Sequence, residues 1–209
     1  MIIWLASGNI HKKRELSGIL KQQDLSGRYP ELKIPLEAGL YFEPEETGNS
    51  FLDNALIKAI ELWRLLEESR PSLYKSGDPV IADDSGLCVD ALDGRPGIHS
   101  ARYGGKDLGA AEKNALLLSE LGDKPMRKAR FVCAMALYYG PDRFFVAQET
   151  MDGELVSNIE TARGAGGFGY DPILYIPELG RTVAELSDEE KNRYSHRAKA
   201  GRAIGRMLC

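Results

Sequence analysis

Residues 129–139, a run from Ala129 to Tyr139, constrain the fold more than any other stretch of this sequence. The run has the length of a strand, and after its charged start almost every side chain is apolar. Because successive strand residues point to opposite faces of a sheet, such a strand must be covered on both sides. We therefore expect it to lie at the centre of a sheet inside a layered α/β domain.

The remaining elements follow from short apolar runs and helical spacing. Strands are predicted at residues 2–6, 32–36, 79–82, 87–92, 144–151, 153–160 and 173–176, and helices at 108–121 and 187–208. Another helix is predicted from about His11, with Leu16, Ile19 and Leu20 on its inner face. Gly140-Pro141-Asp142 predicts a hairpin between the central strand and the next one. This order predicts one α/β domain over residues 1–209, with a mixed β-sheet.

One further helix, over residues 52–66, is the clearest prediction. Its apolar residues fall at helical spacing over four turns: Leu52, Ala55, Leu56, Ala59, Leu62, Trp63 and Leu66. Ser50 and Asp53 can form a capping box at its start, and Ser187 with Glu190 can form another before the C-terminal helical region. We expect the helix over residues 52–66 to belong to the core.

Charge favours a small anionic ligand over a polymer. The net charge of -4 argues against the broad basic face that duplex nucleic acid requires. Residues 11–21 and 188–209 are nevertheless locally rich in Lys and Arg. These basic segments fit binding of a small anion, although solvated helix faces explain the charge equally well.

The N-terminus and the cysteines predict a soluble, cytoplasmic protein. Cys88, Cys133 and Cys209 are odd in number and lack paired spacing, so neither a disulfide framework nor a zinc cluster is expected. The apolar N-terminal run is short and has no basic segment before it, which indicates a buried strand rather than a signal peptide. No stretch approaches the length of a transmembrane helix.

Two pairs of acidic residues are candidates for a metal site. Asp83 and Asp84 follow a predicted buried strand, at the strand end where α/β sheets place ligands, and only one of them can face a shared site. An Asx-turn is the simpler explanation of Asp-Asp-Ser-Gly. Glu45 and Glu46 precede a helix, where acids are often only partners of the helix dipole. Together with Asp84 they could complete an Mg²⁺ site.

Two further segments are candidates for binding a nucleotide. Ser7-Gly8-Asn9-Ile10-His11-Lys12 links a strand to a helix and suits phosphate, although it is no Walker A motif and could be a plain turn. Gly166-Gly167-Phe168-Gly169-Tyr170-Asp171 could stack on a base and bond its edge, unless Phe168 belongs to the core. His196-Arg197 could recognise carbonyl or phosphate oxygens, or lie on a helix surface. No arrangement for covalent catalysis stands out.

In this order, the clusters resemble the inosine triphosphate pyrophosphatase family, also called the Ham1 family. The resemblance covers essentially the whole chain. It is strongest in IADDSGLCVDALDGRPGIHSARYGG from Ile81, GGFGYDPI from Gly166 and AELSDEEKNRYSHRAKA from Ala184.

The resemblance implies an elongated mixed sheet flanked by helices, two lobes around a nucleotide-binding cleft, and a homodimer. It implies Mg²⁺-dependent hydrolysis of ITP, dITP and XTP to the monophosphate and pyrophosphate. Asp84 matches the metal ligand and proton acceptor, and Glu45 or Glu46 matches the second acid, with Glu45 preferred. The matching substrate-binding residues are Ser7, Gly8, Asn9, Ile10, His11, Lys12, Ser85, Phe168, Gly169, Tyr170, Asp171, Lys191, His196 and Arg197.

Ser7 stands where the family usually has Thr, and both residues supply a hydroxyl. Two alternatives share the same pocket: a nucleotide sensor without catalysis, and a phosphatase that releases the γ-phosphate. The paired carboxylates argue against a sensor, because a triphosphate binder gains from acids only when a metal lies between them. Neither polymeric nucleic acid nor a membrane is an expected partner.

Overall fold

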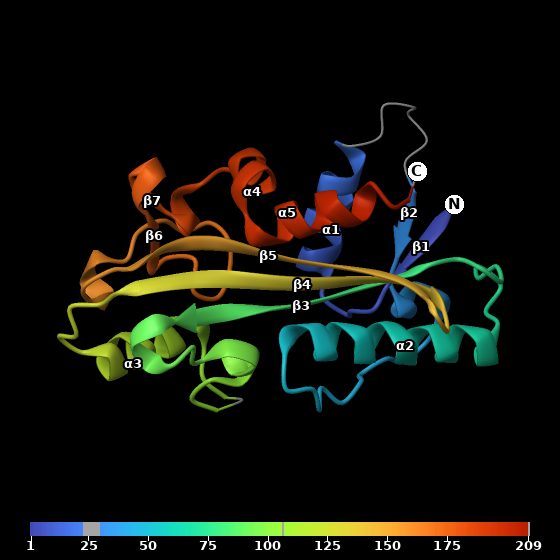
Figure 1. The fold of residues 1–209 in the computed structure, drawn as a ribbon, viewed down its shortest axis with the longest axis horizontal. Helices are drawn as coiled ribbons and strands as arrows, with labels where there is room; N and C mark the ends of the chain where they lie inside the picture. The colour runs from blue at the N-terminus through green and yellow to red at the C-terminus, as the bar shows by residue number, and fades with distance from the viewer. Residues whose placement is uncertain (23–29, 106, 209) are drawn as a thin grey trace. The chain divides into compact units, whose positions relative to one another are not determined.

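The computed structural model describes residues 1–22, 30–105 and 107–208, and shows a mixed seven-stranded sheet in the order β2-β1-β3-β4-β5-β6-β7 (Figure 1). The strands are β1 (Ile2–Leu5), β2 (Glu31–Lys33), β3 (Val80–Val89), β4 (Lys128–Gly140), β5 (Arg143–Leu155), β6 (Leu174–Ile176) and β7 (Arg181–Thr182). The helices are α1 (Ile10–Lys21), α2 (Phe51–Ser69), α3 (Ala110–Leu121), α4 (Asp188–Tyr194) and α5 (His196–Gly205). The predicted α/β class and the central position of β4 are confirmed.

The chain divides into two compact units. Unit 1 comprises Met1–Asp84, Cys133–Glu149 and Arg197–Cys209, and unit 2 comprises Ser85–Val132 and Thr150–His196. In unit 1, β1 pairs in parallel with β2 and with β3, whereas in unit 2 β6 pairs antiparallel with β5 and with β7. The strands β3, β4 and β5 contribute residues to both units.

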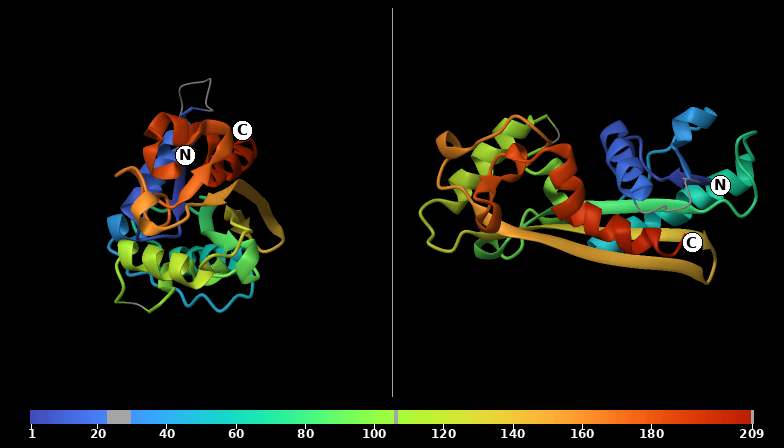
Figure 2. Two further views of the ribbon diagram at one scale, coloured as in Figure 1. Left: turned by 90° about the vertical axis from the view of Figure 1, so that its left-hand side faces the viewer. Right: turned by 90° about the horizontal axis from the view of Figure 1, so that it is seen from above.

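Helices cover both faces of the sheet in unit 1. The views in Figures 1 and 2 place α2 on one face and α1 with α5 on the other. The second face packs Leu16 and Leu20 of α1 and Ile204 of α5 against Ile3 and Leu5 of β1. Gly201 favours the close packing of α5 on α1, because a Cβ there would lie only 3.0 Å from Cγ2 of Ile19.

The helix predicted from periodicity is α2. Ala55, Ala59, Leu62 and Leu66 are fully buried, as their spacing requires. The helix begins where Ser50 Oγ accepts a hydrogen bond of 3.1 Å from the Asp53 N–H. Periodicity and the N-cap therefore predicted this helix correctly.

Unit 2 has its own core, built around α3. Leu117 and Leu121 of α3 pack with Leu87 and Val89 of β3 and with Ile173. The predicted capping box at the start of α4 is present: Ser187 Oγ accepts from the Glu190 N–H, and Glu190 Oε2 accepts from the Ser187 N–H. The C-terminal helical region is two helices, since Ser195 between them has an extended backbone.

The prediction of separate strands at 79–82 and 87–92 is wrong. A single strand, β3, runs from Val80 to Val89 with the acidic pair in its interior. Both carboxylates are bonded by side chains of flanking helices, so the strand needs no turn to bring them to solvent. The Asx-turn interpretation of this motif is excluded for the same reason.

The predicted third strand over residues 153–160 is also wrong, because β5 continues to Leu155. Asp152-Gly153 has the composition of a hairpin turn but lies within the strand. A Cβ at Gly153 would lie 2.4 Å from the Tyr175 carbonyl oxygen, so this glycine serves the close approach of β6 rather than a turn. At the other edge, β2 ends at Lys33 and a 3-10 helix, Pro35–Ala38, replaces the rest of the predicted strand.

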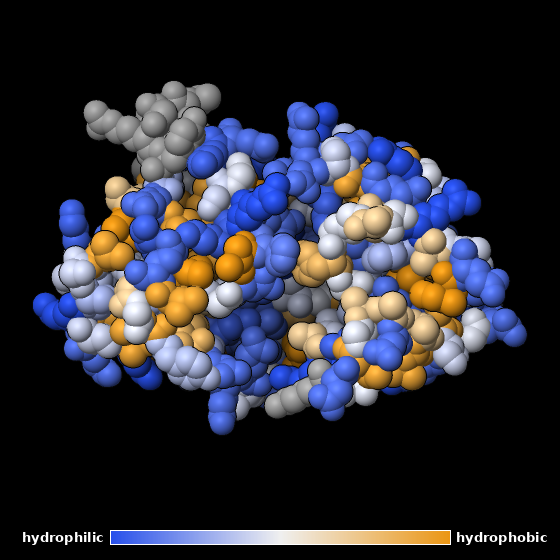
Figure 3. Space-filling model, turned by 180° about the vertical axis from the view of Figure 1, so that it is seen from behind, coloured by the Kyte–Doolittle hydropathy of each residue, from blue (hydrophilic) through white to orange (hydrophobic). Residues whose placement is uncertain are grey.

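Within the described ranges, no helix is both long and apolar enough to cross a membrane. Figure 3 shows hydrophobic residues in separate patches among hydrophilic ones on one face of the molecule. Neither Cys88 nor Cys133 is in a disulfide, and Cys209 lies outside the described residues.

Two neighbouring residues of α2 offer a test of the core. Replacing fully buried Leu62 by Ala is expected to lower the free energy of unfolding by about 2–5 kcal/mol, because it leaves a cavity. The exposed neighbour Glu61 is the control, and Glu61→Ala should change that free energy by less than about 0.5 kcal/mol. Urea unfolding at constant m-value measures both, and equal effects would contradict the packing described for α2.

Candidate functional site

Asp83 is a buried charge of unit 1 that two cations hold. Its carboxylate accepts hydrogen bonds from Lys12 Nζ of α1 at 3.0 Å and from Arg197 Nε of α5 at 3.2 Å. Burial alone would raise the pKa of Asp83, but the charges of Lys12 and Arg197 outweigh it and hold the pKa well below the usual range. Asp83 is therefore a permanent anion that ties β3 to two helices.

Arg197 is itself buried between two acids. Its Nη1 donates to Glu15 Oε2 at 2.6 Å, while its Nε donates to Asp83. Burial would lower the pKa of Arg197, but the charges of Asp83 and Glu15 raise it. The guanidinium of this predicted substrate-binding residue is thus engaged within the protein, whereas Lys12 keeps 19% of its side chain exposed.

Asp84 bonds to residues of α2, on the opposite face from Asp83. Its carboxylate accepts from Asn54 Nδ2 at 3.3 Å and from Lys58 Nζ at 2.9 Å. Lys58 Nζ also donates to Glu46 Oε1 at 2.6 Å, so one ammonium bridges two carboxylates. Of the two glutamates considered from the sequence, Glu46 joins this cluster, while the neighbouring Glu45 is exposed.

The environment shifts the pKa of Asp84 opposite to that of Asp83. Burial raises the pKa of Asp84, the negative charge of Glu46 adds to the rise, and Lys58 offsets only part of it. Burial would lower the pKa of Lys58, but Asp84 and Glu46 raise it, so the ammonium stays charged. Of the two aspartates, Asp84 is therefore the one whose carboxylate takes up a proton more readily, because its pKa is raised while that of Asp83 is lowered.

The chemistry of this cluster fits a hard divalent cation. Asp84 and Glu46 place carboxylate oxygens within reach of one shared positive centre, the Lys58 ammonium. Mg²⁺ is usually bound by one or two protein carboxylates, with substrate oxygens and water completing its shell. Among the described residues, no three His, Cys, Asp or Glu side chains converge, so a cation here would rely on such a small carboxylate set.

The loop from Ser7 to Lys12 is a capped helix start beside open space. Asn9 Oδ1 accepts from the N–H groups of His11 at 2.9 Å and Lys12 at 3.2 Å, and Ser7 Oγ accepts from the Asn9 N–H. A Cβ on Gly8 would meet no heavy atom within 4 Å. Asn9 therefore fixes the turn, and Gly8 leaves its outer side open to an anion.

The glycine-rich segment of unit 2 is shaped by a buried ion pair. Lys191 Nζ lies 2.8 Å from Asp171 Oδ2, and that oxygen also accepts from the Phe168 N–H at 2.9 Å. A Cβ on Gly167 would fall 1.9 Å from Asp171 Oδ2, and its φ of 74° is also one that side chains disfavour. The ion pair and the tight turn require glycine at this position.

Phe168 projects from this turn toward solvent, with 47% of its surface exposed. Its ring lies 5.5 Å from Lys191 Nζ, which can stabilise it as a cation–π partner. The alternative that Phe168 belongs to the core is wrong. Tyr170 is the buried aromatic instead, and its hydroxyl donates to the Ser100 carbonyl at 3.0 Å.

His196 and Ser85 complete the predicted set in unit 2. The imidazole of His196 stacks on Phe131, with ring centroids 4.9 Å apart and an interplanar angle of 18°. His196 is buried rather than displayed on a helix surface, and Ser85 is half-buried in β3.

Besides Glu15, which bonds Arg197, three residues at these clusters were not predicted from the sequence. Asn54 and Lys58 bond Asp84, and Asn114 Nδ2 of α3 donates to the Gly169 carbonyl at 3.1 Å, which holds the glycine-rich turn. All three interrupt the buried stripes of their helices: Asn54 and Lys58 are spaced four apart and each directly precedes a buried alanine, and Asn114 precedes Leu117 and Leu118. A polar residue on an apolar stripe is the signal that could have found them.

Comparisons of sequence and of structure match nearly the whole chain to the same group of proteins. A model described as the Ham1 family matches residues 3–207. The dITP/XTP pyrophosphatase of Treponema denticola is 43% identical over 100% of this chain and 98% of its own, and that of Geobacillus kaustophilus is 45% identical over 95% and 89%. The Ham1 protein structures of Staphylococcus aureus and Coxiella burnetii superpose with TM-scores of 0.80 and 0.81, at 35% and 36% identity, covering all of this chain and 98% of theirs.

Removing the charge of Asp83 should destabilise unit 1 in a pH-dependent way. At about pH 7, Asp83→Asn is expected to lower the free energy of unfolding by about 3–5 kcal/mol, because Lys12 and Arg197 lose a buried partner. The folded-state pKa of Asp83 is depressed, so its ionic stabilisation is complete above the unfolded pKa and falls as pH drops below about 4.

The difference between wild type and Asp83→Asn should therefore be constant from about pH 7 to pH 5 and narrow at lower pH. Denaturant titrations across this range measure it. Exposed Asp142 in the β4–β5 turn is the control, since Asn also tolerates its positive φ and should leave stability almost unchanged. A difference that grows on acidification would contradict the described ion pairs.

Proposed function

Because the chain belongs to the Ham1 family, we propose that it is a nucleoside triphosphate pyrophosphohydrolase that cleaves ITP, dITP and XTP to the monophosphate and pyrophosphate. The function would remove purine nucleotides with hypoxanthine or xanthine bases from the nucleotide pool. The single structural observation that supports it best is the partly buried Asp84–Lys58–Glu46 cluster, since its carboxylates suit a divalent cation and its ammonium suits a triphosphate.

The proposed reaction is attack of water on the α-phosphorus. A new P–O bond forms to the water oxygen, the bond from the α-phosphorus to the bridging oxygen breaks, and pyrophosphate departs with that oxygen. Mg²⁺, when held by Asp84 and Glu46, would polarise the phosphate oxygens and lower the pKa of the attacking water. We assign Glu46 rather than Glu45 to this role because Glu46 shares Lys58 with Asp84.

Asp84 is assigned to orient the water and accept its proton. Its raised pKa supports this role, because a carboxylate is a better base when its pKa lies closer to the working pH. Asp83 cannot substitute for it, since Lys12 and Arg197 hold its pKa far lower. Asn54 and Lys58 act as positioning residues, because they fix the Asp84 carboxylate from α2.

We assign the binding of the negatively charged triphosphate to cationic side chains and backbone N–H groups. The partly exposed Lys12 and the open side of the Gly8 turn suit phosphate oxygens. Preorganised donors of this kind act most strongly where charge grows during the reaction.

The exposed Phe168 is assigned to the purine base. An aromatic ring on a turn fixed by Asp171, Lys191 and Asn114 is a rigid stacking platform. Hypoxanthine and xanthine carry an oxygen at C6 where adenine carries an amine, so N–H donors of the turn or of His196 would stay unpaired with ATP. Such mismatches can give discrimination on the order of 10⁴.

We also propose that the protein acts in the cytoplasm as a homodimer, as its family resemblance implies. The free thiols of Cys88 and Cys133 support a reducing compartment.

Product analysis tests the proposed reaction. The protein is incubated with ITP, dITP, XTP, ATP or GTP and Mg²⁺, with and without EDTA, and the products are separated. Monophosphate with pyrophosphate from ITP, dITP and XTP is expected, and EDTA should abolish it. Orthophosphate with diphosphate would favour the γ-phosphatase, and unchanged nucleotide would favour a sensor. Asp84→Asn should lose turnover by about 10²–10⁴-fold while keeping its fold, so near-normal activity in this variant would refute the role of Asp84.

The adjacent glutamates provide a matched pair of variants. Glu46→Gln is expected to lower kcat/KM for ITP by at least about 100-fold and to raise the Mg²⁺ concentration needed for half-maximal rate, because it removes one carboxylate of the cluster. Glu45→Gln, at an exposed position, should stay within about threefold of wild type. Steady-state rates over a Mg²⁺ titration measure both, and a larger effect at Glu45 would reverse the assignment.

A further inference from the structure

Each of the four carbonyl oxygens of residues 168–171, the turn that carries Phe168, accepts a hydrogen bond from within unit 2. Three of them accept from backbone N–H groups at 3.1 to 3.3 Å. These donors belong to Asp171, Ile173, Leu174 and Ala184. The fourth carbonyl, that of Gly169, accepts from a side chain instead, Asn114 Nδ2 of α3, at 3.1 Å. Asn114 therefore completes what the backbone leaves undone.

The N–H groups of the same turn are used differently. The Phe168 N–H donates to Asp171 Oδ2, but in the part of the chain that the structure describes the N–H groups of Gly169 and Tyr170 reach no acceptor. Backbone N–H groups without a partner in the protein bond water or a ligand. The turn thus offers N–H donors to a bound molecule, while its carbonyl oxygens are bonded to the protein.

The side chain of Asn114 is an unusual choice for its place in α3. It is 3% exposed, and its Oδ1 is buried without a hydrogen-bond partner among residues 1–22, 30–105 and 107–208. A buried amide with its oxygen unpaired costs stability on an otherwise apolar stripe. Local departures of this kind are expected where a residue serves function. The one bond that Asn114 makes is the bond to Gly169.

We propose that Asn114 is a positioning residue that sets the base specificity of the site, because it keeps the Gly169 carbonyl away from the purine. The inference rests on the proposed function, which assigns Phe168 to the base. Gly169 directly follows Phe168, and a Cβ on Gly169 would meet no heavy atom within 4 Å. The carbonyl consequently has room to turn outward, beside the base, once Asn114 does not hold it.

A free carbonyl at this place would change which purines bind. The 6-amine of adenine donates hydrogen bonds, so it would gain an acceptor. The 6-oxo group of hypoxanthine or xanthine is itself an acceptor, so it would face a second oxygen. With the Gly169 carbonyl bonded to Asn114, adenine finds N–H donors and no matching acceptor on the turn. Asn114 therefore acts by rejecting adenine nucleotides.

Binding of the two monophosphates tests this role without cleavage. IMP and AMP differ only at position 6 of the purine, and isothermal titration calorimetry of the full chain gives both dissociation constants. Asn114→Leu removes the donor with little change in side-chain size. It should tighten AMP binding about fivefold and weaken IMP binding about twofold, because AMP gains a hydrogen bond and IMP meets a second oxygen, so the preference for IMP falls about tenfold.

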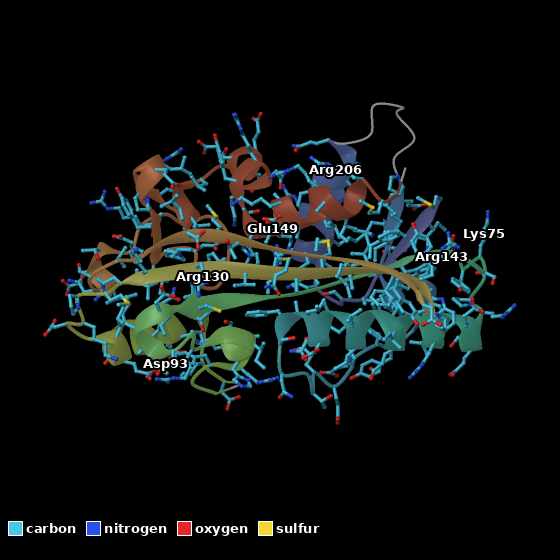
Figure 4. The ribbon with its side chains drawn as sticks, in the orientation of Figure 1. Lys75, Asp93, Arg130, Arg143, Glu149 and Arg206 are labelled. Carbon is cyan, nitrogen blue, oxygen red and sulfur yellow. The ribbon has the colours of Figure 1, made fainter. Side chains whose placement is uncertain are left out.

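Leu118→Ala is the matched control, because Leu118 is buried one turn further along α3 and does not bond the glycine-rich turn. It removes packing from unit 2 and should leave the preference for IMP within about twofold of wild type. Exposed Asp93, labelled in Figure 4, gives a surface control in the same unit. Asp93→Asn suits its positive φ and should change nothing.

A second variant and a kinetic measurement complete the design. Asn114→Asp keeps the size of the side chain but has no N–H at neutral pH, and should shift the preference in the same direction. Thermal unfolding shows that each variant is folded. In the cleavage of ITP and ATP, both Asn114 variants should change KM and leave kcat within about threefold of wild type, because the base lies away from the reacting phosphorus.

The role of Asn114 is overturned by a wild type that does not prefer IMP to AMP. It is equally overturned by Asn114 variants whose preference matches that of wild type or of Leu118→Ala. Since neither monophosphate is cleaved to pyrophosphate, the binding ratio is independent of the reaction. A protein that prefers IMP through Asn114 but releases no pyrophosphate from ITP would refute the proposed reaction and leave the role of Asn114 standing.

Discussion

Two adjacent buried carboxylates in the middle of β3 are the constraint on which the rest of unit 1 depends. Asp83 and Asp84 lie on a continuous strand, so their side chains must point to opposite faces. Burying two charges without partners would cost far more than a domain's net stability. Each face must therefore bring its own cation: Lys12 and Arg197 on one side, and Lys58 on the other. The positions of α1, α2 and α5 are tied to this requirement.

The same arrangement separates the chemical roles of the two acids. Asp83 has two cations and a depressed pKa, which makes it a structural anion. Asp84 shares its single cation with Glu46 and has a raised pKa, which leaves it able to take up a proton more readily than Asp83. Neighbouring carboxylates whose environments push their pKa values apart are a recurring feature of hydrolytic sites. The proposed function assigns catalysis to Asp84, whose negative charge is offset by a cation that it shares with a second carboxylate.

Periodic patterns predicted the elements of the fold well. The helix α2 was predictable because its apolar stripe and its N-cap both indicate a helix over the same residues. The strand β4 was predictable because it is a long apolar run, as expected of a strand that is buried on both faces. Predictions failed where the local composition indicates a turn but contacts with distant residues keep the segment in a strand. Asp83-Asp84-Ser85-Gly86 and Asp152-Gly153 both have the composition of turns, yet both lie inside strands. Side chains from distant segments form hydrogen bonds with the aspartate carboxylates, and β6 occupies the space beside Gly153. The residues next to these positions in the sequence indicate neither contact.

The candidate site was predictable only where a motif names its residues. The partners that fix these residues, Asn54, Lys58, Glu15 and Asn114, belong to no motif, because their roles arise from packing between elements. The glycine-rich turn illustrates the difference. Its glycines suggested a ligand loop, but what makes Gly167 necessary is the Asp171–Lys191 pair behind it, 20 residues apart in sequence. Asp171 also accepts from the Phe168 N–H, so a buried electrostatic contact holds the turn on which the Phe168 ring is exposed.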